Sequence, residues 1–307
     1  MIPKIIRYLI DSNYRFKVKK GHGVYNKLSD EEYLKLCFKQ YIGKDLNLEN
    51  PKTFNEKIQW LKLYDRNPEY TRMVDKYLVR DYIAKTIGPE YLIPLIGVWD
   101  HPDEIDFDNL PNQFVLKCNH NSGLGMCICK DKTKLNVNSV KNELKKGLSQ
   151  DYYLTGREWP YKDVPRKIIA EKYMVDDSGY ELKDYKLHCF NGTVKYTLVC
   201  SDRFSGLGER LTFFDREWSV MPLERRRYPK SEVEIKKPKS YEKMVELAEK
   251  LAKNIPFVRV DFYDVNGKIY FGELTFYPGS GFEEFVPYVW DENLGDCLVL
   301  PTCKNDG

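Results

Sequence analysis

The sequence predicts an α+β protein, because its helical and strand patterns are largely separated along the chain. Helical patterns dominate residues 29–88, and short apolar runs typical of strands begin only at Tyr91. The clearest strand pair is FVRVDFYDVNGKIYFGELTF (257–276), in which β-branched and aromatic residues flank an Asn-Gly turn. Helices first, followed by strands mixed with helices, is the order expected of the α+β class.

The first ten residues, MIPKIIRYLI, are predicted to form a short amphipathic helix. Lys4 and Arg7 lie between apolar residues at helical spacing, which are Ile2, Ile5, Ile6, Leu9 and Ile10. Charges within so short a segment exclude a transmembrane span and argue against a signal peptide. We expect this helix to dock on the protein's own body, and peripheral contact with a membrane surface is the alternative.

Three longer helices follow in the region before the strands. Ser29 precedes a helical pattern and is expected to cap it. Thr53 and Glu56, in TFNEKIQWLKLYD, have the spacing of a capping box. The segment EYTRMVDKYLVRDYIAKTIG is expected to form one helix that ends at Gly88, since glycine often follows the last helical turn.

The remainder of the chain alternates between strands and helices. Strands are predicted in YLIPLIGVW, FVLKC and KIIAEKYM, and a helix is predicted from Val137 to Leu148. YKLHCFNGTVKYTLVCSD reads as a hairpin that turns at Asn191-Gly192. SYEKMVELAEKLAKNI is an amphipathic helix with Ser240 as its expected cap, and it leads into the hairpin at 257–276.

Composition narrows the classes of function. The 307 residues include 49 basic and 46 acidic residues, so the net charge of +3 gives no reason to expect a nucleic-acid partner. Eight Cys and four His are scattered without a C-x-x-C pair, so a zinc site is not expected. Reduced thiols in a cytoplasmic protein are the simpler interpretation.

Asp261 and Glu273 stand on opposite arms of the 257–276 hairpin, among residues that favour a buried sheet. A two-residue turn would pair Asp261 with Gly272 and send the acids to opposite faces, whereas an odd-length loop centred on Gly267 would pair the acids. Paired acids would suit a hard cation such as Mg²⁺. The alternative is a buried ion-pair network with Arg259.

Several motifs resemble the ATP-grasp superfamily. RVDFYDVNGKIYFGELTFYPGSGF resembles the end of the D-alanine–D-alanine ligases, IIAEKYM resembles the superfamily's adenine hinge, and DKYLVRDYIAKTIG resembles the segment that opens the grasp module. NPKTFNEKIQWLKLYDRNPEYT, IGPEYLIPLIGVWD and LKDYKLHCFNG resemble the TupA-like branch. The resemblance implies two gripping subdomains, at 75–175 and 176–307. Residues 1–74 are predicted to be helical, where many ATP-grasp enzymes carry a larger α/β domain.

The same resemblance implies where ATP would bind. Glu171 would contact adenine or ribose, the backbone of Lys172 and Met174 would read the base edge, and Tyr173 would pack beside them. Lys76 and Lys117 would reach toward the phosphates, since lysine is a compact cation suited to that role. A glycine-containing loop would cover the phosphates with its backbone amides; its candidate residues are Asn121, Ser122, Gly123 and Gly125.

The resemblance also implies how the chemistry is divided. Asp184 belongs to a D-Y-K motif similar to the D-x-R of related ligases, and Lys186 with Arg203 would contact the transferring phosphoryl group. Arg259 and the Gly279 amide would steady an acyl phosphate and a later oxyanion. The expected Mg²⁺ ligands are Asp261, Glu273 and Thr275, the last of which replaces the family's usual Asn.

The implied reaction joins a carboxylate to an amine with ATP and Mg²⁺. The family's association with teichuronopeptide and surface polysaccharide points to an amino acid and a uronic or sugar acid as substrates, for capsule or surface-polysaccharide synthesis. Arg225, Arg226 and Arg227 are candidates for contact with an anionic acceptor. Two alternatives remain: a glycosyltransferase, although no D-x-D motif is present, and an ATP-dependent sugar kinase with Glu283 or Glu284 as its base.

Overall fold

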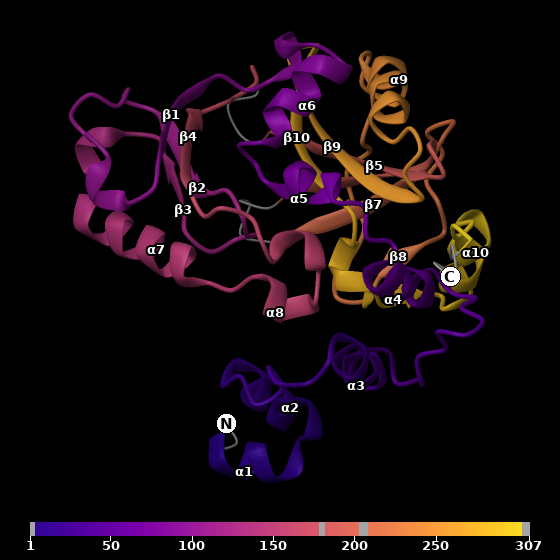
Figure 1. Cartoon of the computed structure of the whole chain (residues 1–307). Helices are drawn as coiled ribbons and strands as arrows, with labels where there is room; N and C mark the ends of the chain where they lie inside the picture. Colours follow the sequence, from indigo (N-terminus) through magenta and orange to yellow (C-terminus); the bar gives the residue numbers. More distant parts are fainter. Residues whose placement is uncertain (1–3, 178–181, 203–207, 303–307) are drawn as a thin grey trace.

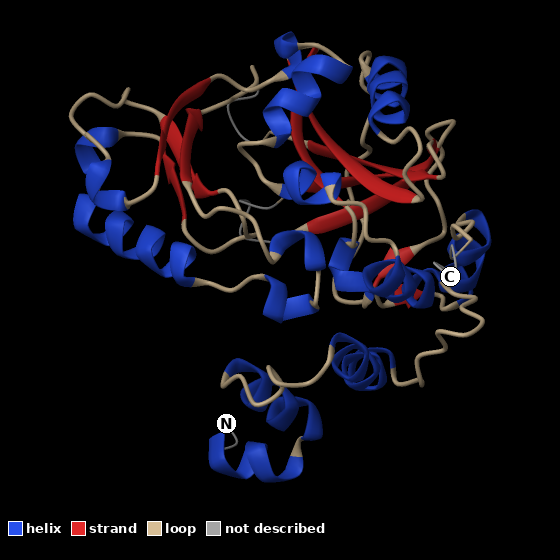
Figure 2. Cartoon of the chain, in the orientation of Figure 1, coloured by secondary structure: helices blue, strands red, loops and turns tan. Residues whose placement is uncertain are grey.

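The computed structural model describes residues 4–177, 182–202 and 208–302. Its two main antiparallel sheets lie in separate parts of the molecule, with helices packed around them (Figure 1, Figure 2). The arrangement confirms the predicted α+β class. Among the described residues, no helix combines the length and apolar character needed to cross a bilayer.

The described chain begins with the helices α1 (Lys4–Ile10), α2 (Ser12–Gly21), α3 (Asp30–Ile42) and α4 (Phe54–Tyr64). Ser29 with Glu32, and Thr53 with Glu56, form complete capping boxes, which confirms both expected caps. The expectation that the first helix docks on the protein body is wrong. No residue of α1 is buried, and its apolar side chains remain exposed; Ile2 lies outside the described residues.

The helix expected to end at Gly88 is instead two helices, α5 (Glu69–Val74) and α6 (Val79–Thr86). The break is at Asp75, whose buried carboxylate accepts hydrogen bonds from the backbone N–H groups of Tyr77 (2.8 Å) and Leu78 (3.2 Å). An Asp side chain that binds nearby N–H groups stabilises a turn that competes with continuation of the helix. Lys76 therefore lies in the connection between the two helices.

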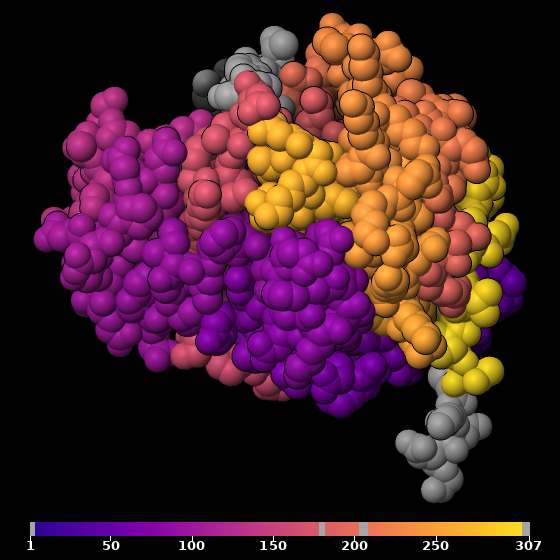
Figure 3. All heavy atoms as spheres, turned by 90° about the horizontal axis from the view of Figure 1, so that it is seen from above, coloured from indigo at the N-terminus to yellow at the C-terminus, as the bar shows by residue number. Residues whose placement is uncertain are grey.

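The first sheet has four strands in the order β1-β4-β2-β3. They are β1 (Leu95–Trp99), β2 (Phe114–Cys118), β3 (Met126–Cys129) and β4 (Ile168–Lys172), and β3 is a strand that the sequence analysis did not predict. Helix α7 (Val137–Ser149) packs on this sheet, where Val140 and Leu144 share a core with strand residues, and α8 (Tyr153–Gly156) follows it. Figure 3 shows this magenta lobe opposite the orange segment that belongs to the second sheet.

The second sheet has five strands in the order β10-β9-β5-β6-β7. They are β5 (Asp184–Phe190), β6 (Thr193–Ser201), β7 (Arg210–Asp215), β9 (Phe257–Val265) and β10 (Lys268–Thr275). The predicted turn at Asn191-Gly192 is confirmed, because Phe190 pairs with Thr193 across it. Strands β8 (Glu224–Arg225) and β11 (Phe285–Val286) form a small two-stranded sheet. Two more helices are α9 (Tyr241–Leu251) and α10 (Val289–Cys297). Short 3₁₀ turns lie at Pro89–Tyr91, Pro102–Glu104, Lys132–Lys134, Trp159–Tyr161 and Pro278–Gly281.

Helix α9 covers one face of the second sheet and leaves the other for polar side chains. Cys189 on β5 contacts the Ala248 carbonyl of α9, and the apolar α9 residues share the sheet's core. Because side chains alternate along a strand, the residues next to Cys189 face away from α9. Ser240 precedes α9 but does not cap it with its side chain, as had been expected; its hydroxyl donates to Asp264 instead.

The β9–β10 hairpin follows neither of the two registers considered from the sequence. The turn has two residues, since Val265 pairs with Lys268, but the pairing shifts between Phe271 and Glu273. Gly272 is the extra residue of this β-bulge, so Glu273 pairs with Asp261 after all. The bulge therefore places the two acids on one face of the sheet, with Thr275 opposite Arg259.

Candidate nucleotide and metal site

Five charged side chains form a continuous network on the sheet face opposite α9. They are Asp184, Lys186, Arg259, Asp261 and Glu273. Arg259 donates to both oxygens of Asp261 at 2.7 Å and to Glu273 Oε1 at 3.0 Å. Lys186 donates to Asp261 at 2.5 Å and also to Asp184. These contacts show that Arg259 pairs with both acids, as the alternative interpretation of the sequence expected.

Mutual pairing decides the charge state of this network. Burial alone would raise the pKa of Asp261, but Arg259 and Lys186 outweigh that effect and lower it. Burial alone would lower the pKa of Lys186, but Asp261 and then Asp184 raise it. The same balance raises the pKa of Arg259. Asp261, Lys186 and Arg259 therefore stay ionised at neutral pH, which suits a site for phosphate and cation.

Glu171 on β4 is the centre of a second network, on the first sheet. It is 7% exposed, and Lys117 Nζ lies 2.6 Å from its Oε2 while Arg80 Nη1 lies 3.2 Å from its Oε1. Arg80, on α6, also donates to the Ile93 carbonyl at 2.9 Å. The sequence analysis missed Arg80. Lys117 and Glu171, which were predicted at the phosphate and adenosine ends of ATP, contact each other directly, and Glu171 is paired with two cations.

The predicted hinge spans the end of β4, which contains Glu171 and Lys172, and the two residues after it. The backbone N–H of Lys172 donates to the Pro94 carbonyl at 3.0 Å, so this donor serves the junction with β1 and does not face a base. Tyr173 and Met174 are half-buried beyond the strand end. Lys130 Nζ lies 5.9 Å from the centre of the Tyr173 ring.

The loop from Asn119 to Met126 joins β2 to β3 as a hairpin with a buried base and an exposed tip. Lys76 Nζ donates to the Asn121 carbonyl at 2.5 Å, which ties the α5–α6 connection to the loop. Ser122 and Gly123 are exposed. Gly125 is buried at φ +70°, and a Cβ there would lie 2.7 Å from Cys118 Sγ and 2.8 Å from the Gly147 Cα. Gly125 is thus required for close approach to α7.

Charges on both sheets act on Lys76. Burial lowers the pKa of Lys76, with Glu273 of the second sheet opposing that effect and Lys117 of the first sheet adding to it. Burial and then Glu158 and Glu273 raise the pKa of Tyr152, which follows α7. The predicted lysines, loop and acids therefore lie around one region between the sheets.

Gly279 lies in a turn that α4 holds in place. It has φ +56°, and a Cβ would lie 2.5 Å from Glu283 Oε1. Lys62 Nζ donates to the carbonyls of Ser280 (2.7 Å) and Gly156 (2.8 Å), and Gln59 Nε2 donates to the Gly281 carbonyl at 2.6 Å.

Asn55 completes this set of α4 contacts, exchanging hydrogen bonds of 2.8 and 2.9 Å with the backbone of Glu283. Asn55, Gln59 and Lys62 are each at most 1% exposed. Burial lowers the pKa of Lys62 to about 8. Their spacing of four and three residues, one helix face, was the signal that the sequence analysis overlooked.

His188 is a second residue that the sequence analysis missed. It pairs with Arg259 across β5 and β9, its Nδ1 donates to the Lys186 carbonyl at 3.0 Å, and its ring stacks on Tyr196 at 4.1 Å. Burial and then Arg259 lower its pKa, so the ring is neutral. Alternation along the predicted strand, Asp184–Lys186–His188, could have identified it.

Three predicted residues remain to be compared with the structure: Arg203, Thr275 and Arg225. Arg203 lies outside the described residues. Thr275 lies on the same face as the acids, with its hydroxyl 3.4 Å from Glu273 Oε1. Arg225, offered for an anionic acceptor, pairs with Glu283 at 2.5 Å.

Within the described ranges, no group of three or more His, Cys, Asp or Glu side chains is arranged to hold a metal ion. Asp261 and Glu273 nevertheless fit Mg²⁺ by donor chemistry, since Mg²⁺ commonly takes one or two carboxylates and fills its other positions with phosphate oxygens and water. Glu273 has a side chain 37% exposed and lies within reach of a ligand.

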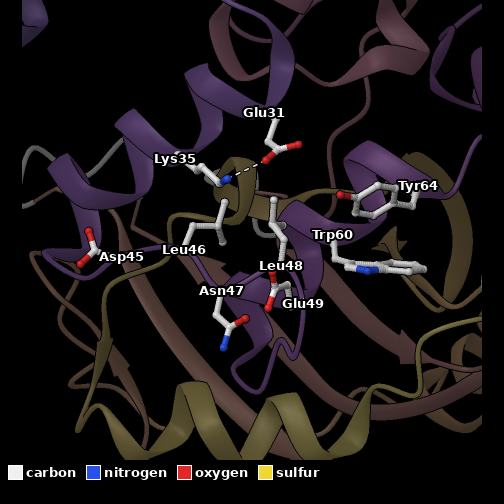
Figure 4. Close-up of a pocket in the computed structure, with 9 residues that line it drawn as sticks. All are labelled: Glu31, Lys35, Asp45, Leu46, Asn47, Leu48, Glu49, Trp60 and Tyr64. Carbon is white, nitrogen blue, oxygen red and sulfur yellow. Dashed lines mark hydrogen bonds and ion pairs between the residues drawn. The ribbon is translucent and has the colours of Figure 1, made fainter.

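A cavity of about 550 Å³ lies away from this site. It is lined by α3, α4 and the loop between them, with Trp60 and Tyr64 on one side and Asp45 on another (Figure 4). None of the predicted site residues lines it.

The chain was compared with protein-family models, curated proteins and solved structures. A protein-family model described as TupA-like ATPgrasp matches residues 56–299. A search of curated proteins returns no match. The D-alanine–D-alanine ligase of Helicobacter pylori shares 16% identity and a TM-score of 0.42, with 80% of this chain and 69% of that chain covered.

Two other solved structures are similar at the same level. The Bacillus anthracis D-alanine–D-alanine ligase complexed with ATP shares 15% identity and a TM-score of 0.39, covering 66% of this chain and 53% of that one. This chain thus spans about half of the Bacillus ligase. D-cycloserine synthetase DcsG shares 13% identity and a TM-score of 0.41, covering 75% and 71%.

Proposed function

The chain belongs to the TupA-like ATP-grasp family, which confirms the resemblance in its sequence and the predicted fold, and from this premise we propose that it is an ADP-forming carboxylate–amine ligase. The observation that carries the proposal is the Lys186–Asp261–Arg259–Glu273 network. Asp261 is buried, and the paired Lys186, Arg259 and Glu273 around it are partly exposed. This combination suits phosphoryl transfer, because positive charge must meet the transferring group while carboxylates hold its Mg²⁺.

In this proposal the two sheets, within predicted subdomains 75–175 and 176–307, hold opposite ends of ATP. Glu171 and the backbone around Met174 would hold the adenosine end, with Lys117 and Lys76 along the phosphates. The loop tip at Ser122 and Gly123 would cover the phosphates. Asp261 and Glu273, with Thr275 beside them, would hold Mg²⁺, which neutralises phosphate charge.

The reaction would proceed in two steps. A carboxylate oxygen of the substrate attacks the γ-phosphorus, the bond to the β-phosphate oxygen breaks, and an acyl phosphate and ADP form. The amine nitrogen then attacks the carbonyl carbon, phosphate leaves and the nitrogen loses a proton. Lys186 and Arg203 would stabilise the negative charge on the transferring phosphoryl group in the first step. Arg259 and the Gly279 amide would steady the carbonyl oxygen in the second.

For the substrates we propose an amino acid and a uronic or sugar acid, joined in the cytoplasm for a capsule or surface polysaccharide. The TupA-like resemblance supports this choice. A sugar kinase would need a free base, and Glu283 is a poor one because it is 7% exposed and paired with Arg225.

The test is ATP turnover with Mg²⁺ against a panel of uronic acids and amino acids, with hydroxylamine as the trapping amine. We expect ADP release that requires an acid, with a hydroxamate formed from that acid. A phosphorylated sugar without hydroxamate would contradict the ligase and favour a kinase.

A further inference from the structure

The apolar side chains of α1 form an exposed stripe. Ile5, Ile6, Leu9 and Ile10 are 77%, 49%, 67% and 69% exposed. At 3.6 residues per turn these four occupy one side of the helix, and Lys4 and Arg7 occupy the other. An isolated apolar residue on a surface needs no explanation, but a contiguous stripe usually marks an interaction site.

The stripe is presented by a firmly attached element. Phe16 of α2 is 4% exposed and packs against Tyr25 and Tyr41, with ring centres 5.3 and 5.6 Å apart. Arg15 donates to the carbonyls of Tyr8 (3.1 Å) and Leu9 (2.9 Å), which holds the end of α1 to α2. Figure 1 shows α1 and α2 at one end of the molecule, beyond α3 and away from both sheets.

Positive charge is concentrated in the same region. Residues 1–28 contain seven of the 49 basic residues and one of the 46 acidic residues, a net +6 that leaves −3 for the rest of the chain. Lys17 and Lys27 are exposed there, as is the apolar Val24, at 58%. A second copy of this chain does not fit this surface well, because two positive segments would repel each other. A nucleic acid does not fit it either, because it offers no hydrocarbon to contact the isoleucines.

We propose that residues 4–27 are a docking surface for an anionic lipid bilayer, with the α1 stripe in the interface and the basic side chains on the headgroups. The apolar and cationic groups are each weak alone and act together, as in peripheral proteins that need two signals. The proposal goes beyond the ligase function and does not depend on it.

The test is co-sedimentation of the full chain with vesicles of phosphatidylcholine, with and without phosphatidylglycerol. We expect binding to the anionic vesicles that weakens with added salt. Ile5→Asp/Leu9→Asp should lower the partition coefficient by about tenfold or more, from two lost apolar insertions. Lys4→Gln/Lys17→Gln/Lys27→Gln should lower it by about fivefold per charge.

The matched control is Val233→Asp, which replaces an equally exposed apolar residue (76%) outside the segment and should bind as the wild type does. Unchanged binding in Ile5→Asp/Leu9→Asp, or no binding by the wild type, would overturn the proposal. So would a wild-type dimer that the same substitutions convert to a monomer, because the stripe would then be a subunit interface. ATP affinity, measured alongside, should not change in any variant.

Discussion

At the scale of single residues, the candidate site is held together by charges that each have a partner. Asp261 is 2% exposed, and leaving such a carboxylate without a cation would cost several kcal/mol. Arg259 and Lys186 supply that compensation from neighbouring positions on the same sheet face. The same cations are suited to a phosphate, so structural and catalytic roles do not exclude each other.

Glu273→Gln tests the metal assignment with little disturbance of the fold. The side chain is 37% exposed, and Arg259 keeps its two bonds to Asp261. Loss of one anionic Mg²⁺ ligand should lower ATP turnover by about 100-fold or more. ADP release under saturating Mg²⁺ measures it. Glu284→Gln, an acid with a 35% exposed side chain paired with Arg226, is the control, and normal turnover in Glu273→Gln would remove the acid from the site.

His120 gives the protein a pH dependence of stability. Burial lowers its pKa to about 4, so the unfolded chain binds a proton between about pH 6.5 and 4 that the folded chain does not. The free energy of unfolding should therefore decrease as the pH is lowered from about 6.5 to 4. This residue should account for up to about 3 kcal/mol of that decrease.

His120→Gln keeps a donor for the Gln150 carbonyl and removes the titration. Urea unfolding at several pH values should show that the wild type loses stability relative to this variant as the pH falls from about 7 to 4. Parallel curves for the two proteins would show that His120 titrates normally in the folded state.

At the scale of elements, α4 fastens the Gly279 turn through a polar face. Lys62→Met should lower the free energy of unfolding by about 1–3 kcal/mol, because the buried Gly156 carbonyl loses its Lys62 donor and the Ser280 carbonyl keeps only the bond from Gln59 (3.1 Å). Lys35→Met on α3 removes only an exposed pair with Glu31 and should cost less than about 0.5 kcal/mol. Chemical denaturation of the two variants compares them, and equal stabilities would show that Lys62 does not fasten the turn.

Substitutions at the two glycines of the 119–126 loop distinguish the cost of a strained backbone conformation from the cost of a packing clash. Gly123 (φ +82°) has open space where a Cβ would stand, so Gly123→Ala should cost about 1–2 kcal/mol for the left-handed conformation alone. Gly125→Ala meets Cys118 and Gly147 as well and should cost a further 1–3 kcal/mol or so. Thermal unfolding distinguishes them; equal losses would mean that the loop does not need its close approach to α7.

Sequence patterns predicted these elements unevenly. Capping boxes and the Asn191-Gly192 turn depend on residues close in sequence, and they were correct. The break at Asp75 and the bulge at Gly272 were missed, because each depends on a choice between two local hydrogen-bond patterns that tertiary packing decides. The short strand β3 was missed because pairing with β2, and not its own pattern, makes it a strand.

At the scale of the whole molecule, the site is assembled from segments that are far apart in the sequence. Motif resemblance supplied most of its residues. Strand alternation and helical spacing could have indicated His188 and the buried face of α4, whereas Arg80 emerges only from contacts across the fold. The exposed apolar face of the N-terminal helix is a similar case: an amphipathic pattern predicts an apolar face, and only the structure shows whether the protein covers it.

The central claim is that the region between the two sheets binds ATP with Mg²⁺, and titration calorimetry of the wild type and Lys117→Ala tests it most directly. Lys134→Ala, with an 82% exposed side chain, is the control. We predict one ATP per wild-type chain, unchanged affinity in Lys134→Ala, and affinity lower by about tenfold or more in Lys117→Ala, since a phosphate would lose a charge-assisted contact. No ATP binding by the wild type, or equal affinity in all three proteins, would contradict the claim.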